Sequence, residues 1–145
     1  MDLNKQPNAK RGLICGIWYL NSHADSKGYL LLEREPVYLM PEYLTAASGL
    51  RGWGQSFEFR ENGDLVDAYA DECGSAPVYH NWSGKWFWNE EEQSIFLRIE
   101  NYPALSDQHV KPSEAYKTGA EFYITELSTQ RMQLRPNNPD VQLWV

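Results

Sequence analysis

The chain has 145 residues, with 13 Lys and Arg against 20 Asp and Glu, and a formal net charge of −7. This length suits one domain with one core, and because the densest basic run is Lys10 and Arg11, nucleic-acid binding is disfavoured. There is no apolar run of about 18 residues, so we expect no membrane span.

Residues 1–11 are largely polar, and we expect them to form a flexible leader before a single domain at residues 12–145. As written, the sequence predicts a cytoplasmic protein. It would be exported, to the periplasm or as a lipoprotein, if an export signal precedes it and is removed. The two cysteines, Cys15 and Cys73, fit the first case as free thiols and the second as a disulfide.

The first predicted strand is Leu13–Asn21, which is apolar on both faces and should therefore be covered on both sides. It contains a Gly-x-Trp motif formed by Gly16 and Trp18. A glycine beside a large indole on one strand face marks a tight bend or a close backbone approach, with the ring covering the gap. The irregular segment that follows includes residues 29–47, a candidate lid over one end of the fold.

A hairpin comes next. The alternating segment Ser56–Arg60 precedes Asn62 and Gly63, which both tolerate positive φ, and Leu65–Ala70 returns. The following predicted strand, Asn81–Asn89, contains a second Gly-x-Trp motif. One face of this strand carries a glycine and three indoles, namely Trp82, Gly84, Trp86 and Trp88.

The hairpin has two possible registers. A two-residue loop would place Glu58 opposite Asp67, two like charges. A three-residue loop with a bulge at Gly63 would pair Arg60 with Asp64, and cross-strand charge pairing favours it by a few tenths to about 1 kcal/mol. We therefore expect the three-residue loop.

The rest of the chain continues the pattern of short strands and turns. Residues 101–119 form a second long loop and a second candidate cover. The remaining predicted strands are Ser94–Glu100, Glu121–Leu127, Arg131–Arg135 and Val141–Val145. About 8–10 strands with almost no helix predict an all-β barrel or sandwich.

The order of the motifs along the chain carries a resemblance. The stretches are Leu13–Leu20, Phe57–Gly63, Cys73-Gly74, Gly84–Trp86, Tyr123–Ser128 and Met132–Leu134. Over residues 12–136 this order resembles the bacterial lipocalin-like domains, a branch of the calycin barrels. The resemblance implies an antiparallel up-and-down β-barrel, with Gly16 and Trp18 at its closed end and a small, mostly apolar ligand in its mouth.

Catalytic and metal-binding patterns are weak. His23, His80 and His109 fall in predicted loops or strand ends without metal-ligand spacing, and a lone histidine there is usually a surface residue. Acidic neighbours would raise the pKa of Cys73, which argues against a nucleophile. A soft metal site built from Cys73, His80 and flexible carboxylates is a weaker alternative. We expect no catalytic residue, no metal and no cofactor, and thus not an enzyme.

The aromatic side chains are the best candidates for binding. We predict a binding protein whose barrel holds a small, mostly apolar or aromatic ligand, with Tyr69 and Trp88 near the open end. At least half of the aromatic candidates, which also include Trp82, should belong to the core instead. The candidate ligand-binding residues are Phe57, Phe59, Tyr69, Trp86 and Trp88.

A second hypothesis belongs to another class. The chain could be an acidic protein-binding module, such as an immunity protein that neutralises a basic bacterial toxin. In that case an acidic outer face would be the working surface, and in either case we expect a monomer or a weak dimer. The candidate residues of that face are Asp64, Asp67, Asp71, Glu72 and Glu90–Glu92.

Overall fold

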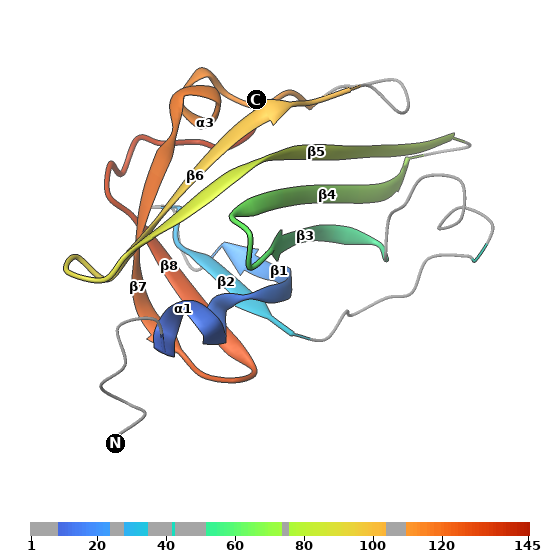
Figure 1. Ribbon diagram of the computed structural model, residues 1–145. Coiled ribbons are helices and arrows are strands. Elements are labelled where there is room, and N and C mark those ends of the chain that lie inside the picture. The colour runs from blue at the N-terminus through green and yellow to red at the C-terminus, as the bar shows by residue number, and fades with distance from the viewer. Residues whose placement is uncertain (1–8, 24–27, 35–41, 43–51, 74–75, 104–109) are drawn as a thin grey trace.

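The computed structural model describes residues 9–23, 28–34, 42, 52–73, 76–103 and 110–145. Eight strands form a closed antiparallel barrel (Figure 1), which confirms the predicted all-β barrel. Among the described residues, the short helices α1 (Ala9–Ile14) and α3 (Glu114–Thr118) lie at opposite ends of the barrel. The strands are β1 (Gly16–His23), β2 (Leu30–Glu33), β3 (Gly54–Phe59), β4 (Asp64–Cys73), β5 (Ala76–Asn89), β6 (Ser94–Asn101), β7 (Ala120–Leu127) and β8 (Arg131–Pro136).

Strands β3 to β8 follow one another around the barrel in up-and-down order, and the β1–β2 hairpin closes it. β1 pairs with β3, and β2 pairs with β8. Part of the predicted lid at residues 29–47 is therefore wrong, because Leu30–Glu33 is a barrel strand with Leu30 and Leu32 buried. Most of the remaining lid prediction, at residues 35–41 and 43–47, lies outside the described residues.

The chain reaches β1 through a helix that the sequence did not predict. Residues 9–14 form α1, so the expected strand from Leu13 begins at Gly16 instead. The Arg11 guanidinium lies 4.7 Å above the centre of the Trp86 ring and donates to the Glu61 carbonyl oxygen at 2.7 Å. These contacts hold residues that we expected in the flexible leader, while residues 1–8 lie outside the described part.

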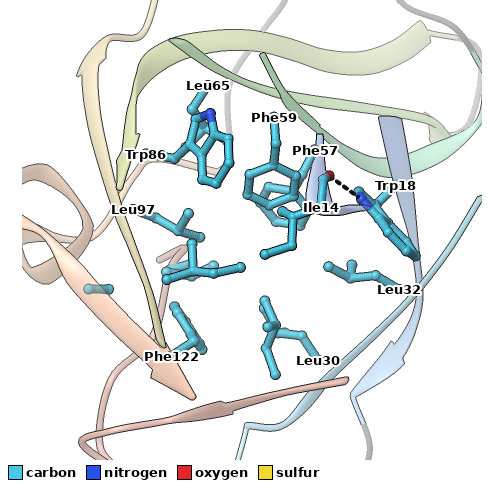
Figure 2. Close-up of a cluster of buried hydrophobic side chains, with 14 of the residues drawn as sticks. Ile14, Trp18, Leu30, Leu32, Phe57, Phe59, Leu65, Trp86, Leu97 and Phe122 are labelled. Atoms are coloured by element: carbon cyan, nitrogen blue, oxygen red, sulfur yellow. Dashed lines mark hydrogen bonds between the residues drawn. The ribbon is translucent and has the colours of Figure 1, made fainter. Parts of the chain in front are cut away.

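The first Gly-x-Trp motif closes the end of the barrel that α1 covers. Trp18 is fully buried, and its indole N–H donates to the Ile14 carbonyl oxygen at 2.7 Å (Figure 2). The Arg34 guanidinium stacks 3.8 Å above the Trp18 ring, a cation–π contact. A side chain at Gly16 would place its Cβ 2.5 Å from Arg34 Nη1, so glycine makes room for the arginine.

The second Gly-x-Trp motif is built in the same way. Trp86 is buried, and its indole N–H donates to the Arg60 carbonyl oxygen at 2.8 Å. A Cβ at Gly84 would lie 1.8 Å from the Arg98 carbonyl oxygen, where the register shifts between β5 and β6. The close backbone approach that the motif predicts is therefore present.

The β3–β4 hairpin has the predicted three-residue loop. Gly63 has a φ of 93° and donates to the Arg60 carbonyl oxygen at 3.0 Å, and Arg60 N–H donates to the Asp64 carbonyl oxygen at 2.9 Å. The ion pairs differ from those that we used to choose the register, since Arg60 pairs with Glu58 at 3.2 Å and Asp64 pairs with Lys85 at 2.5 Å. The loop conformation, more than charge pairing across it, accounts for the register.

We expect Trp18→Ala to lower the free energy of unfolding by about 3–5 kcal/mol, because it leaves a large cavity in the closed end. Urea unfolding measures the change. Phe87→Ala is the matched control: Phe87 is a β5 aromatic with 51 % of its surface exposed, and the loss of its contacts with Phe96 and Arg98 should cost only about 1 kcal/mol. Equal effects for the two variants would contradict the role of Trp18.

We expect Gly63→Val to lower the free energy of unfolding by about 1 kcal/mol or more, because a β-branched residue rarely adopts positive φ. Gly63→Asn is the matched control, since asparagine tolerates this conformation. Thermal unfolding of the two variants under one condition provides the comparison. A valine variant as stable as the asparagine variant would show that the backbone of the turn is not the constraint.

Candidate functional site

The inward-facing side chains change from apolar to polar along β3 and β4, from the α1 end toward the opposite end of the barrel. On β4, Leu65 belongs to the hydrophobic core, Asp67 is fully buried, and Tyr69 is half-buried beside a cavity. The paired residues on β3 follow the same order, because Phe57 lies opposite Asp67 and Gln55 lies opposite Tyr69. The barrel therefore contains a packed core, then a buried polar layer, then a cavity.

The cavity has a volume of about 300 Å³, at the lower end of the range for ligand pockets. The barrel contributes side chains from β1, β3 and β4, and the others come from segments outside the strands. The lining residues are Leu20, Gln55, Tyr69, Val110 and Trp144.

Two segments, which we call the cover, close the barrel beside this cavity: residues 110–118 and 141–145. The backbones of Lys111 and Val145 exchange hydrogen bonds of 3.0 and 2.9 Å, and Ser113 N–H donates to Leu143 O at 3.0 Å. The expected final barrel strand at residues 141–145 is therefore wrong, since Trp144 forms an isolated bridge with Pro112. The long loop that we predicted at residues 101–119 contains α3, and its residue Val110 lines the cavity.

A buried carboxylate joins the cover to the barrel. Asp67 has no exposed surface and accepts hydrogen bonds on both oxygens. Oδ2 accepts from the Tyr116 hydroxyl at 3.1 Å and from the Trp144 indole N–H at 3.3 Å. Oδ1 accepts from the Gln55 amide and lies 3.3 Å from His80 Nε2. Four polar groups thus converge on one side chain, which we call the Asp67 cluster.

This geometry gives Asp67 a structural role. An ionised carboxylate offers about four lone-pair positions, and the four groups occupy them. Burial raises the pKa of the Tyr116 phenol well above its usual value, and the charge of Asp67 and the hydrogen bond to it add to the rise. The phenol therefore stays protonated and remains a donor, which suits a fixed network rather than proton transfer.

His80 is not the surface residue that we expected. It lies on β5, is 2 % exposed, and stacks on the Trp82 ring at a centroid distance of 3.6 Å. The ring of Tyr69 stacks near it at 5.6 Å. The expectation failed because β5 begins at Ala76, five residues before the predicted start of the strand, and this places His80 on the inward face.

The five predicted binding residues do not form one site. Tyr69 lines the cavity, and the Phe57 ring lies 6.3 Å from the ring of cavity-lining Trp144. Phe59 and Trp86 are buried in the core, 5.3 Å apart in an edge-to-face contact. The expectation that Trp88 lies near the open end together with Tyr69 is wrong, because Trp88 lies at the other end of β5. Tyr69 pairs with His80, and Trp88 lies eight residues further along β5, roughly 26 Å away.

The sequence interpretation missed most of the residues around the cavity. One clue was available, because the three-residue loop puts Phe57 opposite Asp67 and therefore turns Asp67 inward. No such clue in the sequence identifies the cover residues at this site, because their positions depend on contacts between segments that are far apart in the chain. The missed residues are Leu20, Gln55, Asp67, His80, Val110, Tyr116 and Trp144.

The acidic residues of the second hypothesis are also dispersed. Asp67 is buried, so its predicted place on an outer face is wrong. Asp71 pairs with Val78 near one end of β5, whereas Glu90–Glu92 follow the other end of that strand, about 36 Å away along it. The described acids therefore do not form a single face.

We also searched the described residues for a metal site, a reactive thiol and a membrane-spanning helix. Within the described ranges, no group of three His, Cys, Asp or Glu side chains could hold a metal ion. Cys15 carries a free thiol, and burial raises its pKa. Among the residues that the structure describes, none of the helices has the length and apolar character needed to span a membrane.

Comparison with known proteins gives no match to this chain, neither to a protein-family model nor to a curated protein or a solved structure.

We expect Tyr116→Phe to lower the free energy of unfolding by about 1–3 kcal/mol, because it removes a donor from a buried charge. The control is Tyr123→Phe on β7, which keeps the ring that packs under Arg135 of β8. Urea unfolding measures both, and hydrogen exchange of residues 110–118 should accelerate in the first variant alone. Identical stability and exchange in the two variants would contradict the role of the Asp67 cluster.

Proposed function

We propose that this protein is a non-catalytic binding protein whose barrel holds a small, mostly apolar or aromatic ligand. The observation that carries the proposal is the cavity of about 300 Å³ between the barrel and its cover. Leu20, Val110 and the rings of Tyr69 and Trp144 supply apolar contact area, while the Gln55 amide supplies a polar group that can orient a ligand.

The architecture supports this proposal in a second way. An eight-stranded barrel is just wide enough to be filled by side chains or to hold one small ligand. Here aromatic and aliphatic residues fill the half near α1, while the half under the cover keeps a cavity that could take such a ligand. The closed barrel and its Gly-x-Trp end fit membership of the bacterial lipocalin-like, calycin-type proteins, which we include in the proposal.

The cavity can be tested by filling it. The neutral fluorescent probe N-phenyl-1-naphthylamine should bind the wild-type protein with saturation and an increase in emission. We expect Val110→Trp to weaken this binding at least about tenfold, because the larger ring occupies space that the probe needs.

Trp88→Phe is the control, since Trp88 is the predicted binding residue that lies away from the cavity. Its probe affinity should equal that of the wild type. Probe binding that Val110→Trp leaves unchanged, or that Trp88→Phe weakens instead, would contradict the proposed site.

A further inference from the structure

Two carboxylates accept hydrogen bonds from polar residues that line the cavity. The Gln55 amide donates to the buried Asp67, and the Tyr69 hydroxyl donates to the exposed Asp71 at 3.1 Å. Within the described part of the chain, no lysine or arginine lines the cavity. The cavity therefore has an acidic environment on the side of β3 and β4.

The hydrogen-bond donors of the lining residues are also directed at these acids. A carboxylate only accepts, so the Gln55 amide must turn an N–H toward Asp67, and its carbonyl oxygen occupies the other branch of the amide. The single indole N–H of Trp144 donates to Asp67, and the single hydroxyl proton of Tyr69 donates to Asp71. An incoming acceptor group would have to displace one of these bonds.

From this arrangement we propose that the cavity selects aromatic molecules that are neutral or cationic and carry an N–H or O–H donor, and that it rejects carboxylates. The inference rests on the proposed function and names the class of ligand. In this proposal a ligand donor pairs with the Gln55 carbonyl oxygen, because the amide N–H is the group that bonds to Asp67. A ligand carboxylate would bring a negative charge close to two carboxyl groups, with no lysine or arginine among the described lining residues to offset it.

The experiment uses ligands that share one ring and differ in one group: 4-ethylphenol, 4-ethylbenzylamine, 4-ethylanisole and 4-ethylbenzoate. Each competes at pH 7 with N-phenyl-1-naphthylamine bound to the wild-type protein. We expect the phenol and the amine to displace the probe at concentrations at least about tenfold lower than the benzoate. The anisole, which lacks a donor, should compete severalfold less well than the phenol.

Variants assign this selectivity to the acids. Asp67→Asn removes the buried charge and Asp71→Asn removes the second one while keeping an acceptor for Tyr69, and each should reduce the phenol-to-benzoate ratio severalfold. The control is Glu92→Gln, which removes a charge from the distant β5–β6 turn and should leave the ratio unchanged. Near-UV circular dichroism checks the folding of each variant, and Asp71→Asn alone decides the assignment if Asp67→Asn does not fold.

The outcomes separate the two proposals. If the probe binds but benzoate competes as well as the phenol, or if no folded variant of Asp67 or Asp71 reduces the ratio, the inference about ligand class is wrong and the binding function stands. If neither the probe nor any of the four compounds binds, the proposed function fails, and the inference falls with it.

Discussion

The arrangement of this protein depends on a carboxyl side chain, Asp67, that is buried inside its barrel. An unpaired carboxylate in an apolar interior is strongly unfavourable, so Asp67 must be surrounded by donors. These donors come from four separate places: β3, β5, α3 and the C-terminal segment. Because two of them belong to the cover, the requirement to solvate Asp67 also determines how the cover sits on the barrel, and thereby the shape of the cavity.

The opposite end is closed by contacts of another kind. Helix α1 ends with carbonyl groups that have no partner within the helix. The Trp18 indole donates to the Ile14 oxygen, and the Arg34 guanidinium donates to the Leu13 and Cys15 oxygens while stacking on the Trp18 ring. Arg11 stacks in turn on the second motif tryptophan, Trp86. Each indole is thus held by a carbonyl at its edge and an arginine on its face.

The sequence predicted those elements whose conformation depends on residues close together along the chain. Alternation and turn chemistry identified most of β3 to β8, and the Gly63 conformation gave the register that places Asp67 inward. The sequence did not reveal β2, α1 or the cover, because these short elements are stabilised by partners far along the chain: β8 for Leu30 and Leu32, the Trp86 ring for Arg11, and Asp67 for the cover. The cavity was missed for the same reason, since Val110 and Trp144 reach it from that cover.

The two ends differ in whether side chains can fill the space. At the α1 end, the hydrogen bonds of the two indoles run to backbone carbonyls at the rim, and aliphatic and aromatic groups fill the interior. Under the cover, the Gln55 amide and the Trp144 indole are directed toward Asp67, so neither can turn inward to fill the remaining volume without leaving a buried polar group unpaired. The same hydrogen bonds that solvate the buried charge therefore also keep the cavity open.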